Sequence, residues 1–349
     1  MLSSHNNPLH PANESLKMPL IDLHFHLDGS LSIDTIITLA EIQGIKLPSK
    51  DRNELKHKLT LTEFTCKNLD DFLDKFAIPS KLLQTKIGIK EGVRLLREEM
   101  TKEGLIYLEI RFAPQKHTYN GLTQEDAINA ALEGLKEDKN LVHTNLILCM
   151  MRGDKNKKEN FETIELAKKY LVEDNGVVGI DLAGSEGEYK TFTFKDEFDL
   201  IKKYKIPTTI HAGEADGYES VEKAVEFGAT RIGHGIAASQ NKNTMDLLSK
   251  KGVILEMCPT SNFVTKASSR DKYPLREFFK NNVKCTINTD DKGVATTTLA
   301  NEFKILEDIC KLTKEEERSL LLNSADAAFT INEVKKHLRE KINIYFDQF

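Results

Sequence analysis

The most regular feature of the chain is an alternation, from residue 104 onward, of short apolar runs with stretches of helical periodicity. This pattern is typical of parallel βα units, because a strand buried on both faces is followed by a crossover helix. The predicted strands are residues 105–112, 144–149, 177–182, 208–211, 231–233, 253–257 and 283–288. The apolar stretch beginning at Ile21 brings them to eight. Eight units predict an α/β fold, the (β/α)8 TIM barrel, whereas a doubly wound sheet would usually carry a Gly-rich turn after its first strand.

Between about residues 32 and 103 the strand signal is lost and apolar residues recur at helical spacing, most clearly over 80–101. We therefore expect a helical insertion after the first strand. Within it, Leu69, Phe72 and Phe76 are spaced as one face of a helix, which is ordinarily helix core rather than a ligand wall. The amphipathic stretches after Pro274 and from residue 297 onward predict more helices than a barrel needs, so extra C-terminal helices are expected.

Residues 1–17 are polar, without a basic start followed by an apolar run, which excludes a signal peptide and predicts a flexible tail. Residues 18–349 are expected to form a single barrel domain, because α/β barrels routinely exceed the usual domain size.

Composition narrows the classes of partner. With 40% hydrophobic residues, 30% charged residues and a net charge of -5, the chain is an ordinary globular protein, unsuited to nucleic acid or an anionic membrane. The apolar run at 146–151 is too short to cross a bilayer, and no obligate protein partner is evident. The five cysteines are widely spaced and lack a Cys-x-x-Cys pair, which favours a reducing, cytoplasmic location.

His24 and His26 are the first candidate chemical groups. Residues two apart on a strand point to the same face, so the two imidazoles project together just before an Asp-Gly turn. From a rigid strand they offer two nitrogen ligands to one metal ion. The alternative is a pair of ordinary half-buried histidines with satisfied hydrogen bonds. The pair needs partners elsewhere in the chain.

Those partners all follow predicted strands, at the rim where barrel enzymes collect their catalytic residues. They are Gly184 after the fourth strand, His211 and Glu214 after the fifth, His234 after the sixth, and Asp290 and Asp291 after the eighth. Each alone has an ordinary explanation, as a turn glycine, a helix cap or a strand-end histidine. Their joint position at one rim favours a functional site.

His24, His26, His211 and Asp290 are the predicted metal ligands, and zinc is the expected ion, with iron, cobalt or manganese as replacements. Four protein ligands are one more than the usual catalytic zinc site holds, so a bound water would make the ion five-coordinate. His234 is left to orient that water or to take its proton.

At this point seven motifs, running in order from residue 24 to 291, together resemble the adenosine deaminase family. They are His-Phe-His-Leu-Asp-Gly-Ser, Leu-Glu-Ile-Arg-Phe-Ala-Pro, Asp-Leu-Ala-Gly-Ser-Glu, His-Ala-Gly-Glu, Arg-Ile-Gly-His-Gly, Cys-Pro-Thr-Ser-Asn and Ile-Asn-Thr-Asp-Asp. The wider amidohydrolase superfamily shares the barrel and the His-x-His, and the later motifs narrow the resemblance to the adenosine and adenine deaminase branch. One departure is Lys292, where the family usually has proline after the Asp pair.

The resemblance implies zinc-dependent hydrolytic removal of the 6-amino group of adenosine, and of 2′-deoxyadenosine, giving inosine and ammonia in purine salvage. It implies Glu214 as the proton donor to N1 and His234 as the group that aligns the attacking water. It assigns substrate binding to His26, to Asp28 on the ribose, Gly184 near N3, Asp291 at N7, and Leu69, Phe72 and Phe76 as the apolar wall.

Two alternatives stay open. In the first alternative, the same catalytic residues act on adenine, a nucleotide or another 6-aminopurine nucleoside instead of adenosine. Adenine-acting relatives, however, tend to carry Glu at the position of Asp28. The second alternative is an inactive binding or signalling protein that has kept the barrel. The intact set of ligands, acid and base argues against it.

Overall fold

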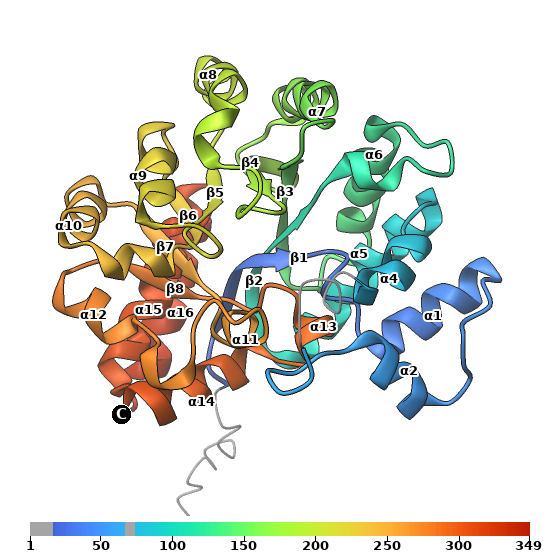
Figure 1. Cartoon of the computed structure of the whole chain (residues 1–349). Helices are drawn as coiled ribbons and strands as arrows, with labels where there is room; N and C mark the ends of the chain where they lie inside the picture. Colours follow the sequence, from blue (N-terminus) through green and yellow to red (C-terminus); the bar gives the residue numbers. More distant parts are fainter. Residues whose placement is uncertain (1–16, 67–73) are drawn as a thin grey trace, which may run out of the picture.

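In the computed structural model, which describes residues 17–66 and 74–349, parallel strands form the inside of the molecule and helices surround them (Figure 1). The strands are β1 Leu20–His26, β2 Leu105–Phe112, β3 His143–Met151, β4 Val177–Ala183, β5 Thr209–Ala212, β6 Arg231–His234, β7 Ile254–Met257 and β8 Cys285–Ile287. The eight predicted strands are therefore confirmed, and their ends differ from the prediction by one or two residues at most.

The strands pair in sequence order as two four-stranded parallel sheets, β1-β2-β3-β4 and β5-β6-β7-β8. Single bridges join the sheets on both sides. Between β4 and β5, the Ile180 amide donates to the Pro207 carbonyl at 2.9 Å. Between β8 and β1, the Asp290 amide donates to His24 O at 2.8 Å and the His26 amide donates to Asp290 O at 3.0 Å. The predicted α/β barrel is thus confirmed.

Helices follow the strands on the outside of the barrel (Figure 1). They are α6 Gln124–Lys136, α7 Lys157–Tyr170, α8 Lys195–Tyr204, α9 Tyr218–Glu226, α10 Lys242–Lys251, α12 Leu275–Lys280, α14 Leu299–Cys310 and α15 Lys314–Ala327. Short helices α11 Pro259–Val264 and α13 Lys292–Ala295 lie in the loops after β7 and β8. Several helices begin at a polar cap, as where Thr123 and Asp126 form a capping box that satisfies the free amides of α6.

The insertion between β1 and β2 is helical, as predicted. It contains α1 Ile33–Gln43, α2 Arg52–Leu59, the 3-10 turn η1 Asp74–Phe76, α4 Ala77–Leu82 and α5 Lys86–Glu103. The helix expected over residues 80–101 is two helices, because the Thr85 side chain accepts from the Gly88 amide and starts α5 there. Leu69 and Phe72 lie outside the described residues, as does all of the expected tail except Lys17.

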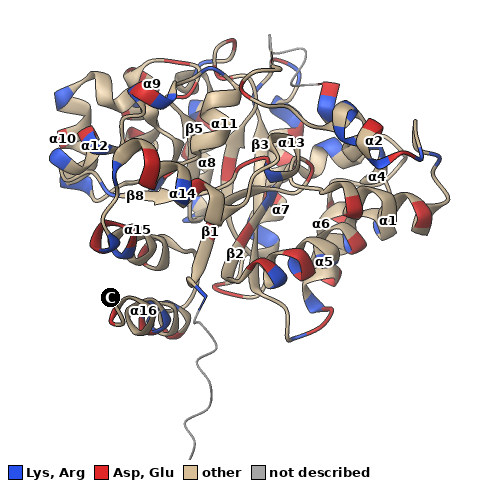
Figure 2. Ribbon diagram, turned by 90° about the horizontal axis from the view of Figure 1, so that it is seen from below, with Lys and Arg blue, Asp and Glu red and all other residues tan. Residues whose placement is uncertain are grey.

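The C-terminal helices extend the barrel. α15 contacts β8 and β1, and α16 (Asn332–Phe346) packs on α15, with the two helices side by side in Figure 2. Leu338, Ile342 and Phe346, spaced four residues apart, form the buried stripe of α16. Residues of the barrel, the insertion and α16 belong to one contiguous hydrophobic cluster.

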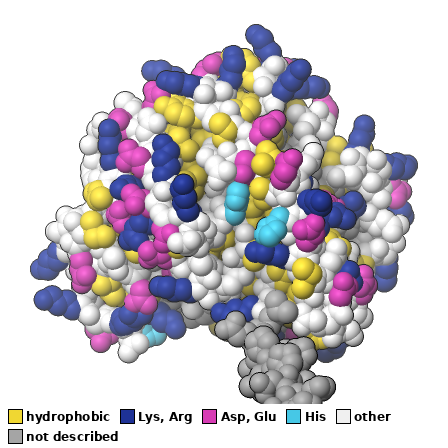
Figure 3. All heavy atoms as spheres, turned by 180° about the vertical axis from the view of Figure 1, so that it is seen from behind, with side chains coloured by type: hydrophobic (Ala, Val, Ile, Leu, Met, Phe, Trp, Pro, Cys, Tyr) yellow, Lys and Arg dark blue, Asp and Glu magenta, His cyan; other side chains and the backbone are white. Residues whose placement is uncertain are grey.

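Charged side chains of both signs are interspersed over the face shown in Figure 3. None of the helices in the described parts of the chain has both the length and the apolar character needed to span a bilayer.

Lys292 opens α13 directly after Asp291, and its buried side chain links this loop to α5. The Lys292 Nζ atom lies 2.6 Å from Glu99 Oε1 and 2.9 Å from Glu103 Oε1. Its side chain is only 7% exposed, so the two carboxylates must compensate the loss of water around the ammonium charge. An ion pair here fastens the loop of Asp290 and Asp291 to the insertion.

We expect Lys292→Met to lower the free energy of unfolding by about 1–3 kcal/mol, because two partly buried carboxylates lose their cation. Denaturant titration followed by circular dichroism measures this change. Glu99→Gln and Glu103→Gln, added to Lys292→Met, should recover part of the loss. Lys195→Met, which removes an exposed pair with Asp199, is the control and should leave the transition almost unchanged. Equal stability of the two lysine variants would contradict the role of Lys292.

Candidate active site

Four imidazoles and a carboxylate meet at the C-terminal end of the barrel. His24 and His26 end β1, His211 lies in β5, His234 ends β6 and Asp290 follows β8. The His24 ring centroid lies 4.5 Å from that of His211, 5.0 Å from that of His234 and 5.3 Å from that of His26. Potential ligand atoms of His24, His211, His234 and Asp290 all lie within 4.8 Å of one another.

Buried carboxylates fix the orientation of two of these imidazoles. His24 Nδ1 donates to Glu256 Oε2 at 2.8 Å, and His211 Nδ1 lies 2.9 Å from Asp181 Oδ2. Burial lowers the pKa of His24 and lowers that of His211 to about 3, which favours the neutral form of both rings. With the proton on Nδ1, the Nε2 lone pair of each ring faces the centre of the site.

Asp290 faces these lone pairs. Its Oδ1 lies 3.1 Å from His24 Nε2 and 3.2 Å from His26 Nε2, and His26 Nε2 lies 3.2 Å from His211 Nε2. The buried His24 Nε2 has no hydrogen-bond partner within the described parts of the chain. The lone pairs of His24 and His211 and the Asp290 carboxylate, crowded together in this way, repel one another unless a proton or a cation lies between them. The donor set therefore fits a divalent transition metal.

The charge around His26 supports the same conclusion. Burial lowers the pKa of His26, but its hydrogen bond to Asp290 and the charges of Asp291 and Asp290 outweigh burial and raise it to about 9. Asp290 and Asp291 therefore favour positive charge at this position, as a proton on His26 or as a bound cation.

His234 differs from the other imidazoles in its hydrogen bonding. Its Nδ1 lies 3.1 Å from the Asn262 side-chain amide nitrogen, which can only donate. This assignment leaves the His234 proton on Nε2, which lies 3.4 Å from Glu214 Oε2 and 3.9 Å from Asp290 Oδ2. A protonated Nε2 is a hydrogen-bond donor rather than a metal ligand. The position of His234 groups it with His24, His211 and Asp290, so only this tautomer distinguishes it from the predicted ligands.

Glu214 lies beside His234, and two side chains hold its carboxylate. Glu214 Oε1 accepts from Thr265 Oγ1 at 3.1 Å and from Asn262 Nδ2 at 3.4 Å. The turn that carries Glu214 is held by Glu186. The Glu186 carboxylate accepts hydrogen bonds from the backbone amides of residues 213, 214 and 215 at 2.6, 3.0 and 2.8 Å. Sequence reasoning gave no role to Glu186.

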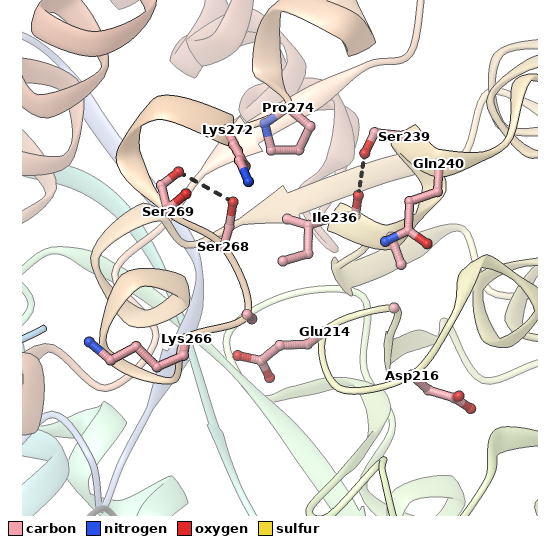
Figure 4. A pocket seen from close by; sticks show the side chains of 13 residues that line it. Glu214, Asp216, Ile236, Ser239, Gln240, Lys266, Ser268, Ser269, Lys272 and Pro274 are labelled. Atoms are coloured by element: carbon pink, nitrogen blue, oxygen red, sulfur yellow. Dashed lines mark hydrogen bonds between the residues drawn. The ribbon is translucent and has the colours of Figure 1, made fainter. Parts of the chain in front are cut away.

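A cavity of about 610 Å³, a volume large enough for a nucleoside-sized ligand, borders Glu214, and of the predicted site residues only Glu214 lines it. Figure 4 shows the Glu214 side chain between the segment of Lys266 and the segment of Asp216. The cavity is lined by Gly213, Glu214, Asp216, Ile236, Ala237, Ser239, Gln240, Lys266, Ala267, Ser268, Ser269, Lys272 and Pro274.

Asp28 and Asp291 lie next to His26, and one potential ligand atom from each of the three lies within 4.8 Å of the others. Asp28 Oδ1 accepts from the Gly29 amide at 3.0 Å. A Cβ on Gly29 would lie 1.7 Å from Asp291 Oδ1, so only glycine allows Asp291 this close to the turn. Burial and the charge of Asp290 raise the pKa of Asp291 well above its usual value.

The remaining predicted substrate residues are partly described. Gly184 follows β4 with φ 101°, a left-handed conformation that suits glycine. Phe76 ends η1 and is partly buried. Leu69 and Phe72 fall outside the described residues, so their predicted roles stay predictions.

Sequence reasoning missed the buried charges beneath the site. Glu109, Arg111, Asp181 and Glu256 are fully buried within strands β2, β4 and β7. The sequence did contain a signal of them, namely charged residues inside otherwise apolar strands. A strand buried on both faces is expected to be continuously apolar, so charged residues within it need partners.

Comparisons with known proteins agree with the resemblance seen in the sequence. The family model described as adenosine deaminase matches residues 19–345. An adenosine deaminase of Haemophilus ducreyi is 45% identical over 334 residues, which cover 94% of this chain and 97% of the relative. An adenosine deaminase of Clostridium botulinum is 40% identical, over 93% of this chain and 98% of the relative.

Solved structures agree in fold. The adenine deaminase of Arthrobacter aurescens has a TM-score of 0.84 at 26% identity, covering 95% of this chain and 100% of its own. The N6-methyl-AMP deaminase of Arabidopsis thaliana has a TM-score of 0.81 at 26% identity, covering 95% and 98%. The family match extends over nearly the whole barrel and includes all the rim residues described above. This chain belongs to the adenosine deaminase family.

Proposed function

We propose that the protein is a zinc-dependent enzyme that hydrolyses adenosine, and 2′-deoxyadenosine, to inosine or deoxyinosine and ammonia. The observation that carries the proposal is the distance of 3.4 Å between Glu214 and His234, at a rim where His24 and His26 contact Asp290 and His211 lies 3.2 Å from His26. Such a rim joins a cation site to a carboxyl group that can supply a proton. Membership of a family of C–N hydrolases supports the reaction class.

His24, His26, His211 and Asp290 would hold the metal. Their support is the converging Nε2 atoms and the orphaned His24 Nε2. Zinc suits three imidazoles and one carboxylate. When bound, the ion supplies a nucleophile at neutral pH, because coordination lowers the pKa of water to about 7.

Glu214 and His234 would perform the proton chemistry. The oxygen of water bonds to C6 of the purine while Glu214 gives a proton to N1, and the bond from C6 to the amino nitrogen then breaks. His234 Nε2–H would donate to the attacking oxygen. Water supplies the 6-oxygen of inosine, and its two protons are distributed to ammonia and back to Glu214. Atoms and charges balance without any further reactant.

Asp28, Asp291, His26 and the Gly184 amide would bind the nucleoside, with Asp28 on the ribose, Asp291 at N7 and Gly184 at N3. The proximity of Asp28 and Asp291 to His26 supports this arrangement. Leu69, Phe72 and Phe76 would cover the sugar. We also propose a cytoplasmic location, since Cys149, Cys258, Cys285 and Cys310 are buried and form no disulfide bond, which suits a reducing compartment.

A nucleotide is the second candidate substrate, because Lys266 and Lys272 line the cavity beside Glu214. Two points make it the weaker candidate. Glu214 is expected to face the base rather than the 5′ end, and Lys266 already donates to the backbone carbonyl of Glu63.

The first prediction is one tightly bound divalent metal per chain. Elemental analysis of protein purified without chelator measures it, and His211→Ala should lose both metal and activity. His337→Ala, at an exposed position of α16, is the matched control and should keep both. Full activity after exhaustive chelation, with no stoichiometric metal in the native protein, would refute the metal site.

The second prediction separates proton transfer from metal binding. Glu214→Gln keeps the shape of the side chain but cannot supply an acidic proton, so kcat should fall at least about 100-fold while the metal content stays unchanged. Glu219→Gln, an exposed carboxylate of α9 that does not line the cavity, should keep nearly native kcat. If Glu214→Gln retained native kcat, another group would have to protonate the purine.

The third prediction concerns substrate choice. A carboxylate-to-hydroxyl hydrogen bond contributes about 1.5–3 kcal/mol, so Asp28→Ala should lower kcat/KM for adenosine roughly 10- to 150-fold and leave weak adenine activity almost unchanged. Ammonia release from adenosine, deoxyadenosine, adenine and AMP measures this. An unaltered preference in Asp28→Asn would limit Asp28 to shaping the turn. Efficient deamination of AMP would instead favour the nucleotide alternative.

A further inference from the structure

One guanidinium lies beneath two metal-ligand histidines. Arg111 Nη1 donates to Asp181 Oδ2 and Arg111 Nη2 to Glu256 Oε2, each at 2.9 Å. The same two oxygens contact the imidazoles, since His24 Nδ1 lies 2.8 Å from Glu256 Oε2 and His211 Nδ1 lies 2.9 Å from Asp181 Oδ2. Each carboxylate oxygen is therefore shared between Arg111 and a histidine.

We propose that Arg111 is a positioning residue of the metal site, which holds Asp181 and Glu256 at the spacing that aims His211 and His24 at one ion. The proposal rests on the metal site of the proposed function and adds a residue that touches neither the ion nor the substrate. Arg111 acts through two carboxylates at once, so it sets the relation of β5 to β1 rather than the orientation of one ring.

The position of Arg111 within the barrel suits this role. Its Nη2 also donates to the Leu23 carbonyl at 2.6 Å, immediately before His24 in β1. Residues on β1, β2, β4 and β7 are thereby joined through one rigid, planar group. The fork of an arginine can satisfy two carboxylates and a carbonyl in fixed directions, whereas the ammonium of a lysine is a point charge on a flexible stem.

Glu256 is held from its other side as well. Its Oε1 lies 2.6 Å from Arg231 Nε and accepts from Thr209 Oγ1 at 3.0 Å. Arg231 also lies 2.6 Å from Glu109 Oε2, which contacts no histidine of the site. Glu109 therefore belongs to the buried charge network without touching the rings. Removing its negative charge can compensate the loss of the positive charge of Arg111 without changing a contact to a histidine.

Arg97 offers a control for burial alone. It is 5% exposed, and its guanidinium donates to the backbone carbonyls of Gly134, Leu135 and Glu137, remote from the rim. A variant of Arg97 loses comparable buried hydrogen bonds, but none of its partners contacts a candidate ligand.

The test compares Arg111→Lys with Arg97→Lys in the full-length protein. Zinc affinity is measured by competition with a chelator, and the visible spectrum of the cobalt-substituted protein reports ligand geometry. Loss of a group that orients metal ligands typically costs 10- to 100-fold in metal affinity. We expect a loss in that range and an altered cobalt spectrum for Arg111→Lys, with kcat lowered more than KM is changed. Arg97→Lys should match the unaltered protein in all of these.

A second variant separates geometry from charge and covers the case in which a single substitution at Arg111 does not fold. Arg111→Gln combined with Glu109→Gln leaves the net buried charge of the network unchanged, and Glu109→Gln alone is its control. Positioning predicts that the double variant still binds zinc 10- to 100-fold more weakly than Glu109→Gln does.

Zinc affinity and a cobalt spectrum in Arg111→Lys equal to those of the unaltered protein would overturn the proposal. Equal losses in the Arg111 and Arg97 variants, or native affinity in the charge-matched double variant, would do the same. Absence of zinc binding by the unaltered protein would instead refute the proposed metal site, so the two failures are distinguishable.

Discussion

Arg111 and Arg231 lie inside the barrel with Glu109, Asp181 and Glu256, all of them fully or almost fully buried. An unpaired ion in such a place costs several kcal/mol, so each charge requires its partners at hydrogen-bond distance. The ion pairs of Arg111 with Asp181 and Glu256, and of Arg231 with Glu109 and Glu256, span 2.6 to 2.9 Å. The register of strands β2, β4, β6 and β7 must satisfy all of these contacts together. The positions of His24 and His211 depend on this network, because their rings contact Glu256 and Asp181.

Closure of the barrel and assembly of the site depend on the same junction. The bridge that joins β8 to β1 is made by the backbone of Asp290, with hydrogen bonds to His24 and His26 on either side. The side chain of Asp290 then faces the Nε2 atoms of the same two histidines at 3.1 and 3.2 Å. Any shift that opened this edge of the barrel would also separate the candidate ligands.

Two residues of the rim, His234 and Asp290, adopt a backbone conformation that non-glycine residues rarely use. His234 has φ 63° and Asp290 has φ 62°. Strain of this kind costs about 1–3 kcal/mol per residue and persists where surrounding contacts over-determine it. Asn262 and Glu214 hold the His234 ring, while Ser261 donates to Asp290 Oδ2 at 2.6 Å. The left-handed conformations turn both side chains inward, so strain and site geometry are linked.

The sequence by itself determined the eight strands, the insertion, the extra C-terminal helices and the family, because these follow from local periodicity and from motifs in a fixed order. It also brought His24, His26, His211, His234 and Asp290 to one rim, because parallel strands in a barrel end on the same side. It did not locate the break before α5, where the Thr85 cap outweighs the apolar repeat. Tertiary structure alone decided which nitrogen each imidazole presents and where Lys292 finds its partners. Those facts depend on Glu256, Asp181, Asn262 and Glu99, which are remote in the chain from the residues they contact, and spacing along the sequence carries no information about such contacts.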